Sequence, residues 1–105
     1  MTRARFQLYN GLIRGFTLTG HAGAGEAGFD VVCAAISSAA YLTANTVTEI
    51  CRCRAEIQER DGYLQVEVAP EDIARCQDIL AGFRLHMEQL QQQYSEWIQV
   101  QIMEV

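Results

Sequence analysis

The sequence predicts an α+β domain in the order ββαββαβ, with two helices packed on a mixed, largely antiparallel sheet. Two observations carry this prediction. Alternating apolar and polar residues are interrupted by the turn dipeptides Asn10-Gly11 and Asp61-Gly62, and two stretches have helical periodicity. The 105 residues, 50% of them hydrophobic and 20% charged, suit one compact domain over residues 1–105.

Both predicted hairpins follow from these alternations. In the first, side chains alternate from residue 3 to residue 8, Asn10-Gly11 favours a type I′ turn, and residues 12–19 return. In the second, residues 51–58 alternate, Asp61-Gly62 makes the turn, and residues 63–68 alternate again. A last strand is expected over residues 97–104. The predicted sheet therefore has five strands.

Two helices are predicted between these strands. Asp30 suits the N-cap of an alanine-rich helix over residues 31–46, which places Cys33 in its first turn. Pro70 marks the start of a second, amphipathic helix. Its apolar stripe comprises Ile73, Cys76, Leu80, Phe83, Met87, Leu90 and Tyr94. Residues 20–28 hold four of the eight glycines, so we expect a mobile loop before the first helix.

The charge is acidic and unevenly distributed. Eight arginines and no lysine oppose thirteen acidic residues, giving a net charge of −5 and excluding a general nucleic-acid binder. Residues 1–55 carry five arginines and three acids (+2), whereas residues 56–105 carry three arginines and ten acids (−7). The acidic half favours a cationic partner.

The sequence shows no sign of export that would favour disulfide bonds between its four cysteines. No apolar run approaches the ~18 residues of a membrane span, and the N-terminus lacks the core of a signal peptide. The four cysteines are therefore expected to be reduced, and the protein cytoplasmic, without a membrane partner. We interpret Cys51, Cys53 and Cys76 as core residues because all three lie on predicted inward faces.

The segment from Gly20 to Ser37 carries the candidate chemistry. His21 stands where a strand ends, and Cys33 is expected at a helix start, where free N–H groups and the helix dipole favour a thiolate. A glycine loop of this length allows His21 to reach the thiol and act as general base, then general acid. The N–H groups also suit an oxyanion. This chemistry needs neither cofactor nor metal.

Other interpretations of the same residues remain open. Cys33 alone on an alanine-rich helix is usually a small core residue, and His21 alone is usually a loop histidine. A zinc site would combine His21, Cys33, Cys51 and Cys53, although Cys-x-Cys is not the usual spacing. His86 is expected at the surface or an interface. A basic sheet face for RNA would comprise Arg3, Arg5, Arg14, Arg52 and Arg54, without stacking aromatics.

The segment GHAGAGEAGFDVVCAAISS resembles the signature of the ribosomal-processing cysteine protease family, Prp. The family pattern is Gly-His-Ala-Gly, a glycine-containing stretch, Asp, two apolar residues, Cys, Ala and a Ser four residues after the Cys. Gly20, His21, Asp30, Cys33 and Ser37 fit it. The element order is similar, and so is the ending YSEWIQV, where Ser-Glu replaces Pro-Asp.

The resemblance implies a cytoplasmic homodimeric endopeptidase that removes a short N-terminal extension from a large-subunit ribosomal protein. Cys33 is then the nucleophile and His21 the base. Asp30 either orients His21 or caps the helix, and Ser37 either hydrogen-bonds within the site or lets the helix pack closely. Gly20 supports the site. The expected substrate-gating loop comprises Ala22, Gly23, Gly25, Gly28 and Phe29, and it closes over the thiol when the N-terminal segment of a basic ribosomal protein binds.

Two other functions compete with this one. In a non-enzymatic, ribosome-associated or RNA-binding adaptor, Cys33 would belong to the core and the glycine loop would bind a partner. A thiol-dependent enzyme other than a protease is also compatible with the residues, because a Cys-His pair does not determine which chemical group of a substrate the thiolate attacks.

Overall fold

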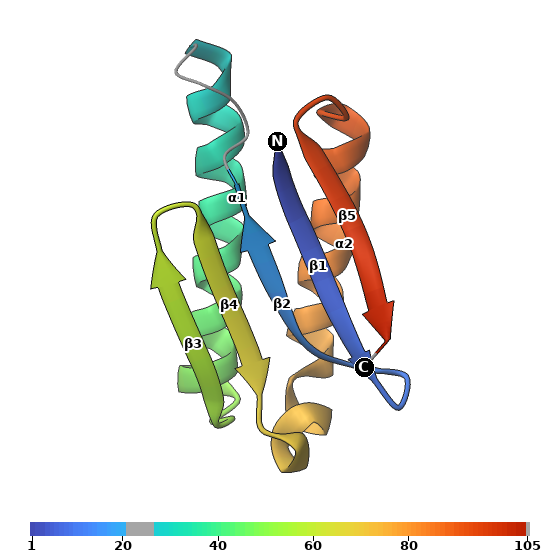
Figure 1. Cartoon of the computed structure of the whole chain (residues 1–105). Coiled ribbons are helices and arrows are strands. Elements are labelled where there is room, and N and C mark those ends of the chain that lie inside the picture. The colour runs from blue at the N-terminus through green and yellow to red at the C-terminus, as the bar shows by residue number, and fades with distance from the viewer. Residues whose placement is uncertain (21–26, 105) are drawn as a thin grey trace.

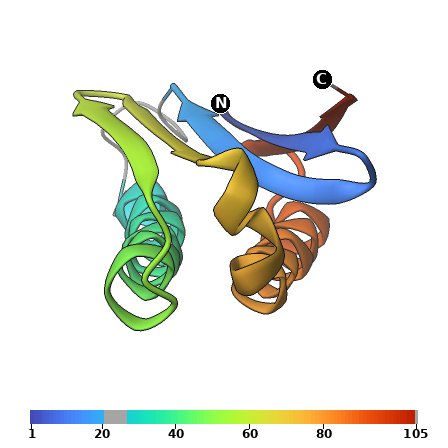
Figure 2. The ribbon, with the colours of Figure 1, turned by 90° about the horizontal axis from the view of Figure 1, so that it is seen from below.

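The structure is a computed structural model that describes residues 1–20 and 27–104, with the backbone alone for residues 27–30. It has two layers, a sheet and a pair of helices that both cover the same face of that sheet (Figures 1 and 2). The elements follow the order ββαββαβ, which confirms the predicted fold class. Among the described residues, none forms a helix on the other face of the sheet.

Five strands form the sheet in the order β3-β4-β2-β1-β5. They are β1 (Thr2–Tyr9), β2 (Leu12–Thr19), β3 (Ala55–Arg60), β4 (Tyr63–Val68) and β5 (Ile98–Glu104). The three pairs β1/β2, β2/β4 and β3/β4 are antiparallel, and β5 runs parallel to β1. The predicted mixed, largely antiparallel sheet is confirmed. The first turn is also as predicted, because Asn10 (φ 52°) and Gly11 (φ 81°) both have the positive φ of a type I′ turn.

The first helix begins earlier than predicted. Helix α1 spans Ala27–Asn45 and continues into a π-helical turn, Thr46–Ile50. Asp30 therefore lies inside the helix, Gly28 and Phe29 belong to it rather than to a loop, and Cys33 is in the second turn. The N-cap prediction is wrong because the helix has already begun at Ala27, and an acidic residue is favoured in the first helical turn as well as at the cap.

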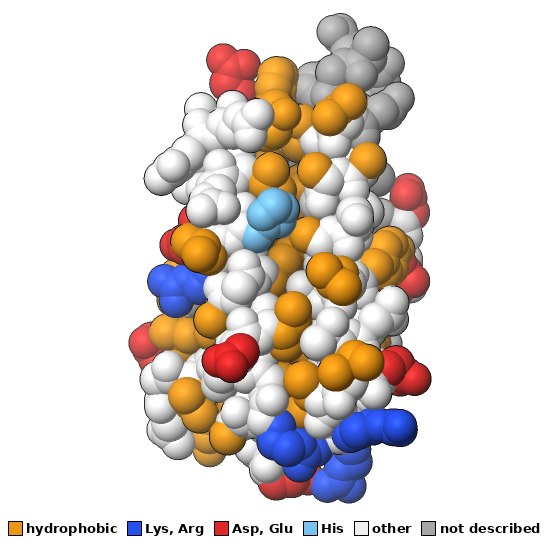
Figure 3. Space-filling model, turned by 180° about the vertical axis from the view of Figure 1, so that it is seen from behind, with side chains coloured by type: hydrophobic (Ala, Val, Ile, Leu, Met, Phe, Trp, Pro, Cys, Tyr) orange, Lys and Arg blue, Asp and Glu red, His pale blue; other side chains and the backbone are white. Residues whose placement is uncertain are grey.

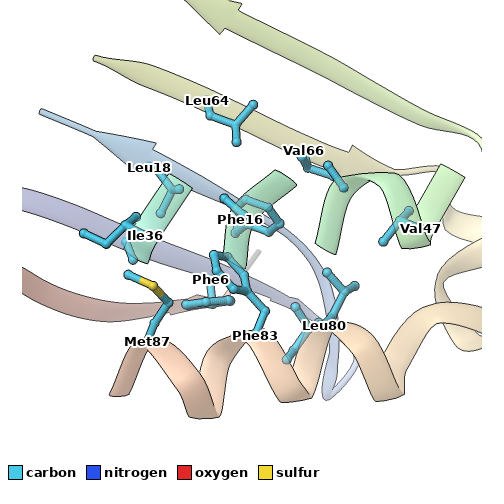
Figure 4. Packing of buried hydrophobic residues seen from close by; sticks show 14 of the residues in the cluster. Phe6, Phe16, Leu18, Ile36, Val47, Leu64, Val66, Leu80, Phe83 and Met87 are labelled. Atoms are coloured by element: carbon cyan, nitrogen blue, oxygen red, sulfur yellow. The ribbon is translucent and has the colours of Figure 1, made fainter. Parts of the chain in front are cut away.

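The second helix follows the prediction closely. A 3₁₀ segment, Pro70–Cys76, leads into α2 (Gln77–Gln93). Six members of the predicted stripe are buried, and the seventh, Tyr94, is partly buried against the core. Phe83 of α2 lies with its ring centroid 5.6 Å from that of Phe6 and 4.7 Å from that of Phe16. These three rings join α2 to β1 and β2 in the centre of the core (Figure 4).

The segment before β3 departs from the predicted strand. β3 begins at Ala55, not near Cys51, because Arg52 has a left-handed backbone (φ 56°) that interrupts the extended chain. Cys53 is still buried, and Cys51 packs partly against the core. Ile57 stands opposite the buried Val66, and it is 44% exposed because β3 is the edge strand.

The segment Val31–Ile50 is long and apolar enough to span a membrane by length and composition. Reading the sequence for uninterrupted apolar runs missed it. Its buried side chains pack on the sheet as part of the core, and they comprise Val32, Ile36, Ala40, Ala44 and Val47. In this fold one face of the segment belongs to the core of the domain, and 33% of the apolar window is buried.

Candidate active site

A groove of about 440 Å³ lies between α1 and the tip of the β3–β4 hairpin, next to the ends of β1 and β2. Its walls come from four stretches of chain that are distant in sequence. The lining residues are Thr2, Leu18, Gly20, Cys33, Ile36, Ser37, Ala40, Tyr41 and residues 59–64. Leu18, Ile36 and Leu64 are buried below it, so the groove has an apolar floor.

Helix α1 presents one stripe of polar side chains to this groove. Cys33, Ser37 and Tyr41 follow one another at intervals of four residues and therefore lie on one helix face. Cys33 is half-buried, whereas Ser37 and Tyr41 are exposed. The structure thus brings Cys33 and Ser37 together as the sequence predicts. Tyr41 is an addition that sequence reasoning missed, although the four-residue spacing could have revealed it.

Gly20 fixes the end of β2 at the rim of the groove. Its φ of +86° lies in the left-handed region, and a Cβ atom there would stand 2.4 Å from the carbonyl oxygen of Met1. Its N–H donates to the carbonyl oxygen of Gly62 at the hairpin tip, 2.9 Å away. Only glycine combines this conformation with so close a backbone approach. The residue that follows Gly20 in the chain is His21.

Tyr41 and Glu59 connect α1 to β3 at the groove wall. The Tyr41 hydroxyl donates a hydrogen bond to Oε2 of Glu59. The carboxylate accepting this bond, together with its negative charge, raises the pKa of Tyr41 above its usual value of 10.0. The sequence held a signal for Glu59 as well, because strand alternation continued from Ala55 and Ile57 places it on the inward face.

Several predicted site residues lie outside the described part of the chain. His21, Ala22, Gly23 and Gly25 fall there, and so do the side chains of Phe29 and Asp30. Their predicted roles therefore stay predictions. The one exception is the capping role of Asp30, which is excluded because Asp30 lies inside α1.

The other three cysteines lie at the far end of α1. Cys51 follows the π-helical turn and donates its N–H to the carbonyl oxygen of Thr46, 2.8 Å away. Cys33 is twelve residues before the end of α1, so about 18 Å of helix separates it from that end. The alternative zinc set with Cys33, Cys51 and Cys53 is therefore wrong. Within the described ranges, no group of three His, Cys, Asp or Glu residues is placed to hold a metal ion.

A buried carboxylate organises this far end. Asp72 is 6% exposed and accepts the Arg54 N–H on Oδ2 at 2.8 Å, while Oδ1 lies 3.1 Å from Nη1 of Arg75. Burial, followed by a hydrogen bond with Cys53, raises the pKa of the Cys76 thiol to about 12. Cys76 and Cys53 are buried core residues, as predicted.

The five-arginine basic face does not form. Arg3 and Arg5 are exposed on the open side of the sheet and donate to Gln99 and Gln101. Arg14 pairs with Glu67 at 3.0 Å. The remaining two, Arg52 and Arg54, lie before β3, where residue 54 pairs with Glu71. The sequence placed them wrongly because it extended β3 back to residue 51.

Solved structures with the same fold include three that match nearly the whole chain. The SMU.848 protein of Streptococcus mutans is 31% identical with a TM-score of 0.88, covering 100% of this chain and 96% of that one. The S. aureus ribosomal processing protease Prp with a covalently linked product peptide is 23% identical with a TM-score of 0.87. The same protease with a substrate peptide is 22% identical with a TM-score of 0.86. Both cover 97% of this chain and 99% of theirs.

No curated protein sequence matches the chain significantly. Residues 1–99, by contrast, match the family model described as cysteine protease Prp. A match over nearly the whole chain, on a fold with a half-buried cysteine at a groove, defines a cysteine protease. Within that class, the chain belongs to the Prp family.

Proposed function

We propose that the protein is an endopeptidase in which Cys33 attacks the peptide bond of a segment bound in the groove. One observation carries the assignment of Cys33. Of the four cysteines, all within the described part of the chain, Cys33 alone lines the groove. It is half-buried, so the sulfur is held by the helix and still accessible to a substrate.

We assign the role of general base to His21. Gly20, the residue directly before it, lines the same groove as Cys33. Because Cys33 lies in the second turn of α1, the helix dipole contributes less to the thiolate than the sequence suggests, since its effect falls off within the first turn. Activation of the thiol therefore depends mainly on the imidazole.

The reaction follows from these roles. The imidazole takes the thiol proton, and the thiolate forms a bond to the carbonyl carbon of the peptide. The imidazolium then donates that proton to the leaving amine, and the C–N bond breaks to give a thioester on Cys33. Water, deprotonated by His21, hydrolyses the thioester and restores the thiol. We assign Ser37, which is one turn along α1 and exposed in the groove, a hydrogen bond to bound peptide.

The proposed substrate is the N-terminal extension of a large-subunit ribosomal protein in the cytoplasm. Support comes from the S. aureus structures, which are ribosomal processing proteases holding substrate and product peptides. The −7 charge of residues 56–105 suits a basic protein substrate. We also retain the prediction that the protein does not bind nucleic acid directly.

We infer that a homodimer forms through the helical face. That face carries apolar side chains along and beside the seam between α1 and α2 (Figure 3). Leu42 of α1 is 64% exposed and Leu85 of α2 is 56% exposed, while His86 lines a shallow hollow between the helices. Burying such side chains against a second copy removes apolar area from water. Leu42→Glu should convert a dimer to monomers in analytical ultracentrifugation, and an unchanged mass would place the interface elsewhere.

Cleavage itself is tested with ribosomal-protein N-terminal peptides and mass spectrometry. Wild-type protein should make one defined cut, and Cys33→Ala should make none while keeping its fold. Cys51→Ala is the matched control, because that thiol is also half-buried but lies at the other end of α1. Retained cleavage by Cys33→Ala would overturn the mechanism. Binding of an uncut peptide would favour the adaptor function instead.

A further inference from the structure

Glu59 and Arg60, which precede the hairpin tip, lie on opposite faces of the sheet. In the β3/β4 pair, Glu59 stands opposite Leu64, and Arg60 stands opposite Tyr63. Directly opposed residues share a face of an antiparallel sheet. Leu64 is buried under the helices, so Glu59 is on the helix side, where the groove is.

Arg60 is directed away from Glu59. Its guanidinium lies 3.8 Å from the centre of the Tyr63 ring, a cation–π contact on the open face of the sheet. Although Arg60 belongs to the groove lining through its place at the rim, its charge is held on the other side of the strand. The helix-facing wall of the groove therefore carries the negative charge of Glu59.

Tyr41 positions that charge. Its hydroxyl donates to Oε2 of Glu59, which holds the carboxylate against the α1 side of the groove. A carboxylate offers about four acceptor positions, so one phenol leaves capacity for a cationic donor. Both side chains are exposed, and a bound peptide can reach them.

We propose that Glu59 is a specificity-determining residue that binds a lysine or arginine side chain of the peptide. The inference rests on the proposed peptidase function and adds a substrate preference to it. Tyr41 lies eight residues after Cys33 on the same stripe, about 12 Å along the helix. An extended peptide rises about 3.3 Å per residue, so the cationic residue lies three to four residues from the scissile bond.

A peptide series tests this assignment. A cleavable peptide carries a single lysine at each position from two to five residues on either side of the cut, and each version is paired with one carrying glutamine there. We expect kcat/KM to favour lysine about five-fold at one position, near the upper limit for a solvent-accessible ion pair. High salt should reduce this preference.

Three variants at two positions of β3 distinguish a specific contact of Glu59 from a general effect of negative charge. Glu59→Gln should bring the lysine-to-glutamine ratio to about one, and Glu59→Lys should reverse it. Glu56→Gln removes one charge from the exposed outer face of β3, opposite Glu67, and should leave the ratio unchanged. A ratio that survives Glu59→Gln, or falls equally in Glu56→Gln, would overturn the assignment.

The failure of this inference can be distinguished from the failure of the proposed function. Fluorescence anisotropy on the Cys33→Ala background measures binding of the same labelled peptides without cleavage. Loss of lysine preference on adding Glu59→Gln supports the assignment even if no peptide is cut by the wild type. Cleavage by the wild type with no lysine preference in either assay rejects the assignment and leaves the peptidase in place.

Discussion

Replacing Gly20 by alanine should destabilise the domain through two separable effects. The left-handed backbone costs a residue with a Cβ atom about 1–2 kcal/mol. The new Cβ would also stand 2.4 Å from the Met1 carbonyl oxygen, and the adjoining Thr2 N–H is held by the Trp97 carbonyl oxygen at 2.9 Å. Moving that backbone adds about 1–3 kcal/mol, as in other overpacked sites. The expected total loss in free energy of unfolding is about 2–5 kcal/mol.

Gly11 provides the matched control, because its φ is +81° and nothing lies within 4 Å of an added Cβ. Gly11→Ala should show the backbone cost alone, and the smaller entropy of the unfolded alanine chain affects both variants equally. With a urea slope of about 1.5 kcal/mol/M, the Gly20→Ala midpoint should fall about 1–2 M below that of Gly11→Ala. Equal midpoints would refute the close approach of Gly20, at the end of β2, to the carbonyl oxygen of Met1.

Three further predictions follow from the described contacts. Glu59→Gln should lower the pKa of Tyr41 toward 10.0, since it replaces the charged acceptor of the Tyr41 hydrogen bond and removes the negative charge that disfavours the phenolate. Ultraviolet titration with Tyr41→Phe as reference measures this pKa, and equal values in the wild type and Glu59→Gln would show that the contact is absent in solution. Burial raises the pKa of the Cys76 thiol to about 12, so this thiol is protonated at neutral pH. Iodoacetamide should therefore alkylate Cys76 only when the protein unfolds, and rapid alkylation of the native protein would contradict this. Phe83→Ala should cost about 3–5 kcal/mol in urea unfolding, against under about 1 kcal/mol for Leu12→Ala at an exposed position of β2, and similar losses would place Phe83 outside the core.

The sequence predicted what depends on local pattern. The Asn10-Gly11 turn, the second-helix stripe and the five strands all follow from periodicity and turn chemistry. The start of α1 did not, because Asp30 suits a cap and a first helical turn equally well. The start of β3 was missed because the alternation through Cys51 and Cys53 does not reveal the left-handed Arg52.

In the candidate site, too, some residues could be predicted from local sequence pattern and others could not. Cys33 and Ser37 are recognisable from one continuous motif, and their spacing places them on one helix face. Tyr41 and Glu59 meet only through packing of α1 beside the second hairpin, which is a tertiary contact between segments far apart in the chain. Local pattern restricts the face on which each lies, but it does not determine which residues face each other across a groove.

The central claim is that Cys33 is the nucleophile, and trapping the thioester tests it most directly. Wild-type protein is mixed with a cleavable peptide, quenched in acid within one turnover and digested for tandem mass spectrometry. We expect the acyl fragment of the substrate on Cys33 and on no other cysteine, because Cys33 alone among the four lines the groove. A cleaved substrate with the acyl group on another residue, or with Cys33→Ala still active, would contradict the account.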